Sequence, residues 1–137
     1  MHTNSIQQPG SDALLRTTFR FNAAFGALSG VIFTLASGWL SRLTGIEPSY
    51  VFQVTGVLLI GFAIWLAWLS LQEKITNGIA WFVVTSDVLW VLGSLAILIA
   101  GWPPLSVPGK WMVAGLAEVV GTFAILQTIG IRKKSVL

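Results

Sequence analysis

The 137-residue chain contains no cysteine and a single histidine, His2. The absence of cysteine excludes disulfides, iron–sulfur clusters, thiol catalysis and cysteine-based zinc sites. His2 lies in a polar segment near the start of the chain, so haem ligation by histidine and histidine-cluster metal sites lack their usual ligand. We therefore expect no catalytic residue, no cofactor, no metal site and no enzymatic activity.

Charge is also scarce, since only 9% of the residues are charged while 55% are hydrophobic. A soluble domain usually carries about 25% charged residues, which indicates a membrane protein of one compact domain. The net charge of +3 comes from basic residues at the edges of apolar stretches, where orientation signals lie. They do not alternate with aromatic residues, so we expect no nucleic-acid partner.

Four long apolar stretches without Lys or Arg dominate the chain. Each has roughly 20 residues, which at about 1.5 Å per residue spans the ~30 Å hydrocarbon core. Because backbone groups in lipid must be paired internally, the stretches predict helices, over residues 19–40, 50–71, 79–102 and 111–131. The predicted fold class is all-α, a four-helix transmembrane bundle. It occupies residues 16–134, between a disordered cytoplasmic tail (1–15) and a C-terminal tail (135–137).

The cations predict the orientation of the bundle. With four spans, six of the eight share one side: Arg16, Arg20, Lys74, Arg132, Lys133 and Lys134. Arg42 and Lys110 share the other, so the positive-inside rule places both termini in the cytoplasm. Tryptophans at both boundaries are typical of an aromatic belt: Trp39, Trp102 and Trp111 outside, with Trp68 and Trp81 inside.

The two halves of the chain resemble each other. Two short matches carry the resemblance: Ser37-Gly38-Trp39 with Ala100-Gly101-Trp102, and Gly61-Phe62-Ala63-Ile64 with Thr122-Phe123-Ala124-Ile125. Asn22 falls near Asp87 when Ser29 is matched to Ser94. The matches favour two duplicated helical hairpins in a parallel repeat, with a pseudo-two-fold axis along the membrane normal. The alternative is that any two apolar hairpins share such short matches.

Small residues mark the surfaces where membrane helices approach closely. Gly26 and Gly30 form a G-x-x-x-G in the first stretch, Gly56 lies in the second, and Gly115 and Gly121 lie in the fourth. We interpret these five as helix-packing residues. For Gly26 and Gly30, contacts with the second or fourth helix of the same chain are favoured over a dimer face. Besides the lipid bilayer, the possible partners are a second copy or another membrane protein.

Two acidic residues lie inside the apolar stretches, and they are the main candidates for a site. Asp87 lies roughly 12 Å from the inner end of its helix and Glu118 roughly 10 Å from the outer end of its own, so a proton shared between them is not expected. Glu118 lies on a stripe of small residues along its helix, and it is predicted to face the bundle interior in protonated form. Asp87 is predicted to be neutral or paired with Arg20.

These acids leave several functions open. They can join helices by hydrogen bonds to Asn22 or Gln53 (or Ser94 and Thr122), or pass protons or cations. The favoured function is a non-enzymatic accessory, assembly or self-associating membrane component. The alternative is a proton-linked small-solute transporter or channel that uses Asp87 and Glu118. A third possibility is a lipid- or pigment-binding module, because the aromatic belts leave Trp65 and Trp90 unexplained.

Three segments, LLRTTFRFNAAFGALSG, SDVLWVLGS and FAILQTIGIRKK, carry a family resemblance. The chain is similar to a widespread type of small bacterial four-helix integral membrane protein, distantly DoxX-like in layout. The resemblance covers nearly the whole chain after residue 13. It implies the four-helix architecture and a bacterial plasma (inner) membrane, and it implies no particular activity.

Overall fold

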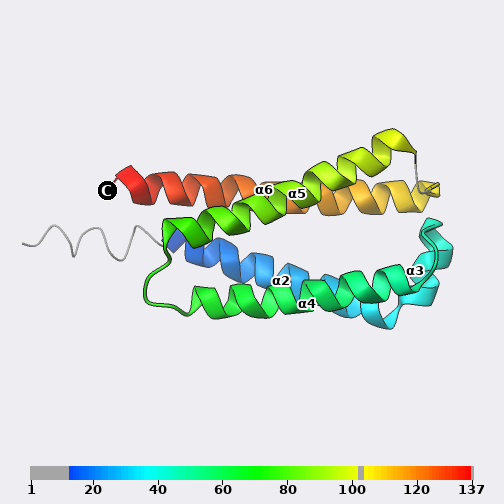
Figure 1. Ribbon diagram of the computed structural model, residues 1–137, viewed down its shortest axis with the longest axis horizontal. Helices are drawn as coiled ribbons and strands as arrows, with labels where there is room; N and C mark the ends of the chain where they lie inside the picture. Colours follow the sequence, from blue (N-terminus) through cyan, green and yellow to red (C-terminus); the bar gives the residue numbers. More distant parts are fainter. Residues whose placement is uncertain (1–12, 102–103, 137) are drawn as a thin grey trace, which may run out of the picture.

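The computed structural model describes residues 13–101 and 104–136, and these form helices joined by short connections (Figure 1). The helices are α2 (Ala13–Leu35), α3 (Ser37–Thr44), α4 (Tyr50–Ser70), α5 (Asn77–Ala100) and α6 (Val107–Val136). The described residues contain no strand, so the predicted all-α class is confirmed. The tail expected to be disordered is already helical from Ala13 onward; residues 1–12, like residues 102, 103 and 137, lie outside the described part.

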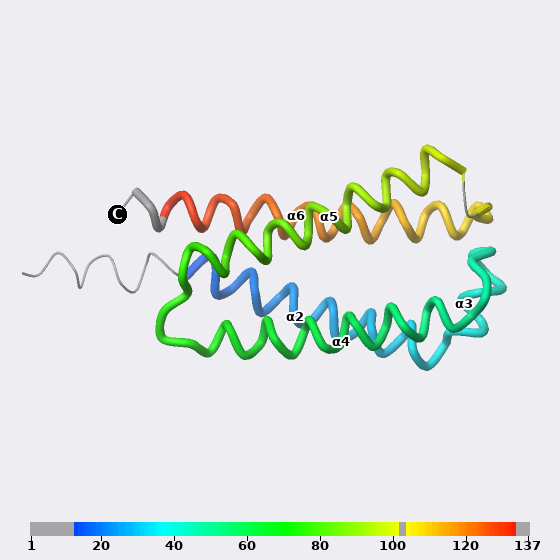
Figure 2. Tube along the Cα trace, in the orientation of Figure 1, coloured from blue at the N-terminus to red at the C-terminus, as the bar shows by residue number. Residues whose placement is uncertain are grey.

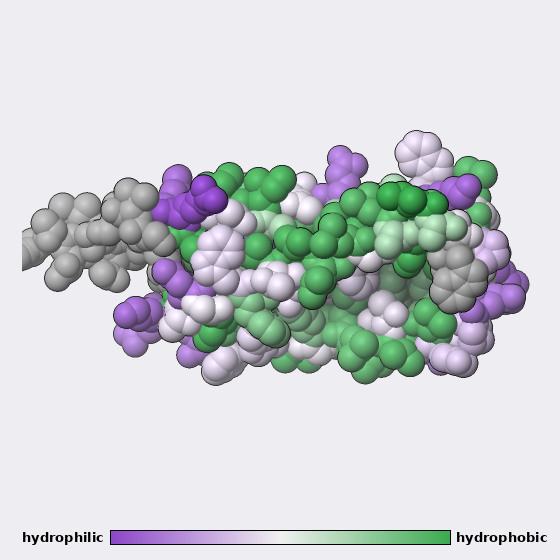
Figure 3. All heavy atoms as spheres, turned by 45° about the horizontal axis from the view of Figure 1, so that its top comes forward, coloured by the Kyte–Doolittle hydropathy of each residue, from purple (hydrophilic) through white to green (hydrophobic). Residues whose placement is uncertain are grey.

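Four of the helices, α2, α4, α5 and α6, are long and apolar enough to cross a membrane. Many large apolar side chains on them are exposed, among them Leu35 at 81% and Ile99 at 84%. Hydrophobic residues dominate the middle of the face drawn in Figure 3, and hydrophilic residues gather toward its two ends. This surface suits a hydrocarbon environment between two polar interfaces. The protein is therefore an integral membrane protein in its architecture.

The first span is longer than predicted and is interrupted once. A single irregular residue, Ala36, separates α2 from α3, and the helical path continues to Thr44 instead of ending at residue 40. Just before the interruption, the hydroxyl of Thr34 donates to the carbonyl of Gly30 at 2.8 Å. Such bonds within a helix tend to bend it. Gly45, at φ 81°, then ends α3 in the left-handed conformation that glycine adopts readily.

The first hairpin is held together by contact between the backbones of α2 and α4. A Cβ atom added to Gly56 would lie 2.6 Å from the carbonyl oxygen of Gly30, and one added to Gly26 would lie 3.5 Å from the Cβ of Ala63. Only residues without a side chain permit the approach at Gly30 and Gly56. The two glycines therefore join helices of the same chain.

The second hairpin packs α5 along α6, and α6 also packs against α2. One end of the bundle, called here the terminus end, contains the start of α2, the end of α6 and the connection between α4 and α5 (Figure 1). There the Arg16 guanidinium donates to the carbonyls of Ser70, the last residue of α4, and Gln72, two residues beyond it. At the opposite end, called the α3 end, the Ser106 amide donates to the Thr44 carbonyl at 2.9 Å. Arg16 thus ties together the two helices of the first hairpin, and the bond from Ser106 to Thr44 joins the two hairpins.

The seam between α4 and α5 is different. Near the terminus end, Trp65 of α4 lies edge-on to Phe82 of α5, with ring centroids 5.7 Å apart. Beyond that point no packing comparable to the other helix pairs joins α4 and α5 in the described residues, and α5 runs away from α4 toward the α3 end (Figure 2). A two-fold axis relating the hairpins would make this seam equivalent to the packed α2–α6 seam. The packing departs from such symmetry here.

Candidate functional site

Three polar side chains from three helices meet in the interior of the bundle. They are Asn22 of α2, Asp87 of α5 and Gln127 of α6, and they are called here the Asp87 triad. Asn22 Nδ2 donates to Asp87 Oδ2 at 3.0 Å, and Gln127 Nε2 donates to the same oxygen at 2.8 Å. Asn22 Nδ2 also donates to Gln127 Oε1 at 3.3 Å. The triad therefore connects the two hairpins through a closed set of hydrogen bonds.

The three residues meet because they lie at matching depths. Asn22 follows the start of α2 by nine residues, Asp87 follows the start of α5 by ten, and Gln127 precedes the end of α6 by nine. At ~1.5 Å per residue, each lies roughly 13–15 Å from the terminus end of its helix. Each also belongs to the buried face of its helix, so the apolar neighbours on that face carry the polar side chain inward.

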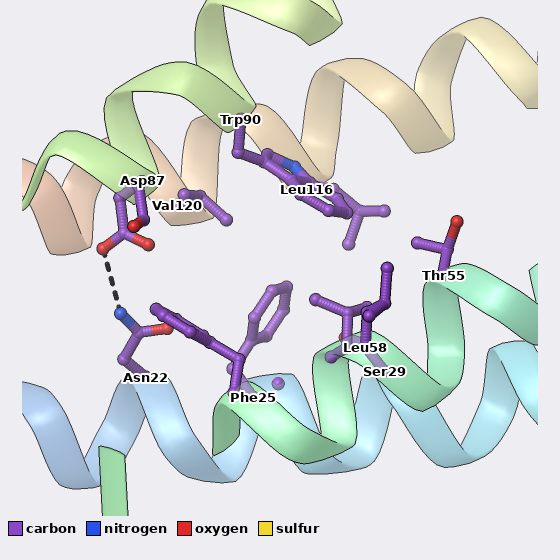
Figure 4. A pocket seen from close by; sticks show the side chains of 13 residues that line it. Asn22, Phe25, Ser29, Thr55, Leu58, Asp87, Trp90, Leu116 and Val120 are labelled. Atoms are coloured by element: carbon purple, nitrogen blue, oxygen red, sulfur yellow. Dashed lines mark hydrogen bonds between the residues drawn. The ribbon is translucent and has the colours of Figure 1, made fainter. Parts of the chain in front are cut away.

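Both amides donate to Oδ2 of Asp87, and the other carboxyl oxygen, Oδ1, receives no hydrogen bond from any described residue. Asp87 is only 4% exposed to the surroundings. It also lines a cavity between the hairpins, and Figure 4 shows its carboxyl group at the edge of that space. One oxygen of the carboxyl group is therefore used for joining helices, while the second is available on the cavity side.

Arg20 is not the partner of Asp87, contrary to the sequence-based expectation. Its side chain is exposed and lines a groove between α2 and α4. Arg20 and Asn22 are two residues apart, which is about 200° around a helix. Because Asn22 faces Asp87, Arg20 must face away from it.

Glu118 is exposed, so the expectation that it faces the interior is wrong. The buried stripe of α6 contains Val113, Ala117, Val120 and Ala124, and Glu118 lies outside it. Gly115 shares the exposed face, and a Cβ added to it would meet nothing within 4 Å. The small residues of this face therefore do not make a helix contact within the chain.

The remaining polar candidates do not join the triad. Gln53 is exposed on α4. The hydroxyl of Ser94 donates to the carbonyl of Trp90, and that of Thr122 donates to the carbonyl of Glu118, each within its own helix. Gly121 is half-buried and would bring a Cβ only to ordinary contact, 3.8 Å from a methyl group of Val91. Of the hydrogen-bond partners considered from the sequence, Asn22 alone bonds to Asp87.

A cavity of about 420 Å³ lies beside the triad, lined by residues from all four spans (Figure 4). Its wall is mostly apolar, with rings from Phe25, Phe62 and Trp90. A second cavity of about 470 Å³ shares Thr55, Trp90 and Leu116 with the first and continues to Ile46 and Glu47 at the α3 end. The two neighbouring cavities lie along the open α4–α5 seam, and together they are called here the lateral cleft.

Trp90 provides a second polar group with unused bonding capacity. Its indole Nε1 is buried, and it is the one buried side-chain nitrogen or oxygen among the described residues without a hydrogen-bond partner. Leaving a buried donor unpaired costs roughly 1–3 kcal/mol, and such groups often mark functional sites. Trp90 lines both cavities with other atoms of its ring, while the unpaired Nε1 is buried away from the cleft.

Sequence reasoning singled out Asp87 and Asn22 but did not include Gln127, Phe25 or Phe62. Gln127 could have been found by comparing the depths of polar residues in the four stretches. It lies about as far from the end of α6 as Asp87 lies from the start of α5, and both of those helix ends are at the terminus end. Trp90 had one signal, because the aromatic belts did not account for it. The rings of Phe25 and Phe62 carried no signal, since phenylalanine is ordinary in an apolar stretch.

No group of three or more His, Cys, Asp or Glu side chains that could hold a metal ion occurs within the described residues. The polar groups that line the cleft are therefore the carboxyl groups of Asp87 and Glu47, the amide of Asn22 and a few hydroxyls, beside aromatic rings. Such a set can hold and orient a molecule that carries a hydrogen-bond donor. Comparison with protein-family models, with curated proteins and with solved structures gave no match.

Proposed function

We propose that this chain is a non-enzymatic membrane protein that binds a small, mostly apolar molecule in its lateral cleft, with Asp87 holding the polar group of that molecule. The observation that carries the proposal is the cavity of about 420 Å³ that ends at Asp87 and lies along the unpacked α4–α5 seam. A seam that opens sideways in a bilayer admits molecules dissolved in lipid.

Size and composition support this proposal. Binding cavities for small molecules usually have volumes of about 300–1,000 Å³ and mostly apolar walls with a few well-placed polar groups. The first cavity falls in that range at about 420 Å³. Its one charged group is Asp87, with Asn22 beside it, while Phe25, Phe62 and Leu58 supply apolar wall and Ser29 and Thr55 add hydroxyls on the side away from Asp87 (Figure 4). The arrangement suits a molecule with one polar end.

A binding role fits the cleft better than catalysis or two-carboxylate transport. General acid–base catalysis needs convergent titratable groups around a substrate, and Asp87 is the sole acid or base lining the first cavity. The proton-linked transporter suggested by the sequence would use Asp87 with Glu118. Because Glu118 is exposed on α6, a transporter would have to operate on Asp87 without it.

Filling the cleft tests the proposal. Thr55 lines both cavities, so Thr55→Trp places an indole where they join. Val57 on the same helix is 59% exposed, so Val57→Trp is the matched control. Small molecules released by solvent from each purified protein are identified by mass spectrometry. We expect a bound molecule in the wild type and in Val57→Trp, and its loss in Thr55→Trp. An identical profile in all three would contradict the proposal.

We further propose that both termini are cytoplasmic, in a bacterial plasma membrane. The support is the excess of cations at the terminus end, which contains Arg16, Lys74 and Arg132. Because the chain has no cysteine, single substitutions can be labelled without background. Lys74 and Lys110 are both exposed and lie at opposite ends of the bundle, so each is replaced by cysteine in a separate variant. In intact cells, an impermeant maleimide should label Lys110→Cys only; labelling of Lys74→Cys alone would reverse the orientation.

A specific observation favours a second role, association with another copy. Glu118 is exposed within a membrane span, where a charged side chain costs on the order of 3 kcal/mol. Beside it, Gly115 leaves open space for an approaching backbone. A two-fold axis along the membrane normal would place Glu118 of both copies at one depth, where the two side chains can meet.

Native mass spectrometry in mild detergent tests this association. Dimers should appear for the wild type and be lost when Gly115→Leu fills the open space. Gly93→Leu is the matched control, because a Cβ at Gly93 on α5 likewise meets nothing within 4 Å. A monomeric wild type, or a dimer that persists in Gly115→Leu, would contradict self-association through this face.

A further inference from the structure

We infer that the molecule bound in the lateral cleft is a lipophilic organic cation, with its charged nitrogen at Asp87 and its apolar part along the cleft. The inference rests on the proposed binding function and names the chemical class of the ligand. Three features carry it: the sign of the charges that line the cleft, the oxygen of Asp87 that receives no hydrogen bond from the described residues, and the aromatic rings that line the same cavity.

The charged residues that line the lateral cleft are all acidic. Asp87 lies at its inner limit and Glu47 at the α3 end. No described lysine or arginine lines either cavity. Arg20 lines a separate groove between α2 and α4, and Lys110 lines another at the α3 end. A cleft lined by one sign of charge in a low-dielectric setting attracts ligands of the opposite sign.

The geometry of Asp87 also calls for a donor from outside the chain. Its Oδ2 accepts from Asn22 and Gln127, which fixes the carboxyl group in place. Its Oδ1 receives no hydrogen bond from the described residues and lies at the cavity. Buried carboxyl groups are normally paired or hydrogen-bonded. An ammonium group on the cavity side would supply both charge and donor to Oδ1.

Aromatic rings complete the recognition of a cation. Phe25, Phe62 and Trp90 line the same cavity as Asp87 (Figure 4). Cations are attracted to the faces of aromatic rings, and more strongly when water is excluded. Two of the rings are supported from behind, since Phe25 contacts Phe123 and Phe62 contacts Trp65, each pair with centroids 5.9 Å apart. The rings are therefore held in position before a ligand arrives.

The second cavity provides the route to Asp87. It begins beside Glu47, which is exposed in the connection between α3 and α4, and joins the first cavity at Thr55, Trp90 and Leu116. An acidic group at the mouth raises the local concentration of cations and hence their association rate. Neutral and anionic molecules would gain nothing from it, so the placement of Glu47 supports the same ligand class.

The inference is tested with two probes of equal shape and different charge. One is 4-phenylbutylammonium, which carries both the positive charge and N–H donors, and the other is pentylbenzene, in which a methyl group replaces the ammonium group. Binding is measured by tryptophan fluorescence and calorimetry in an uncharged detergent. We expect the wild type to bind the cation about tenfold or more tightly than the isostere, a difference of about 1.4 kcal/mol or more.

Three variants make the test specific. Asp87→Asn should remove the preference for the cation. Glu118→Gln changes the other intramembrane acid, which is exposed outside the cleft, and should leave the preference unchanged. Glu47→Gln, at an exposed position that does not endanger the fold, should slow association of the cation and leave its dissociation unchanged. It therefore tests the inference even where Asp87→Asn fails to fold.

The outcomes separate the inference from the proposed function. If the isostere binds the wild type as tightly as the cation, and Glu47→Gln changes no rate, the ligand class is wrong while binding in the cleft stands. If neither probe binds and Thr55→Trp also leaves the profile of released molecules unchanged, the binding function itself is overturned. Loss of the cation preference in Glu118→Gln would assign the charge recognition to a different carboxyl group and contradict the inference.

Discussion

Replacing Asp87 with leucine should lower the free energy of unfolding by about 2 kcal/mol. The substitution removes the oxygen that accepts hydrogen bonds from Asn22 and Gln127, at 3.0 and 2.8 Å. Asn22 and Gln127 remain buried, at 5% and 0% exposure, so Gln127 Nε2 is left without an acceptor and Asn22 Nδ2 keeps only its longer bond to Gln127 Oε1, at 3.3 Å. The change acts on both hairpins, because the triad joins α2 to α5 and α6.

The magnitude follows from two opposing considerations. A buried donor left without an acceptor costs about 1–3 kcal/mol in a water-soluble protein. In membranes, double-mutant cycles average only about 0.6 kcal/mol per hydrogen bond, because the separated helices also find partners. The cost of placing the Asp87 carboxyl group in lipid is largely the same for the packed and the separated helices, so it cancels from the free energy of unfolding. Two lost hydrogen bonds therefore give about 1–3 kcal/mol in total.

Unfolding by increasing fractions of dodecyl sulfate in mixed micelles, followed by tryptophan fluorescence, provides the measurement. Asp87→Asn keeps one oxygen acceptor and should lose at most half as much stability as Asp87→Leu. Ser94→Ala is the control on the same helix, since Ser94 is buried and its hydroxyl bonds only to the carbonyl of Trp90; it should change stability by less than about 0.5 kcal/mol.

The triple variant with leucine at positions 22, 87 and 127 leaves no donor of the triad unpaired. It should recover part of the stability lost in Asp87→Leu, because removing all partners of a buried polar group costs less than removing one. Equal stability of Asp87→Leu and Ser94→Ala would refute the triad as a contact between hairpins. A triple variant less stable than Asp87→Leu would refute the argument about unpaired donors.

Two further predictions concern how the hairpins are built. Gly56→Ala should destabilise the bundle by about 1–2 kcal/mol, because its Cβ would lie 2.6 Å from the Gly30 carbonyl oxygen. Gly61→Ala is the control on the same helix: its Cβ meets nothing within 4 Å, so it should be neutral or slightly stabilising. Equal effects of the two substitutions in the same unfolding assay would contradict the α2–α4 backbone contact. Arg16→Gln should lower the free energy of unfolding by about 1–3 kcal/mol, since the guanidinium bonds to carbonyls at the end of α4. Arg20→Gln, at an exposed site, should lower it by less than about 0.5 kcal/mol. The reverse order would contradict the role of Arg16.

The architecture could be predicted because lipid leaves few choices. Apolar stretches of about 20 residues must be helices in a bilayer, and short connections force neighbouring helices to run antiparallel. The Gly30–Gly56 contact could be anticipated for a related reason, since backbones can touch only where side chains are absent. The ends of the helices were less predictable: Val107 begins α6 four residues before the expected start, with Pro108 in the first turn, where proline is tolerated.

The direction in which a side chain points was harder to predict than its depth. The same rule that identified Gly30 failed for Gly115, because small residues mark any close approach and do not say whether the partner is in the same chain. Glu118 was misplaced for that reason. Hydrophobicity gave no correction, since lipid-facing and interior residues of a membrane helix are almost equally apolar. For Arg20, the 100° turn per residue was decisive once Asn22 was known to face Asp87.

The lateral cleft follows from large side chains rather than from missing ones. Trp65 and Phe82 meet between α4 and α5 at the terminus end, and Trp90 lies about two turns further along α5, in the wall of both cavities. Rings between two helices keep their axes apart, so the residues that bound the cleft also prevent its closure. Trp90→Ala should therefore let α4 and α5 approach each other. Cysteines placed at Thr55 and Leu89, which both line the second cavity, should form a disulfide faster in Trp90→Ala than in the parent double variant. An unchanged or slower rate would mean that the rings do not hold the seam open, and that the cleft owes its width to the connections at the ends of the bundle.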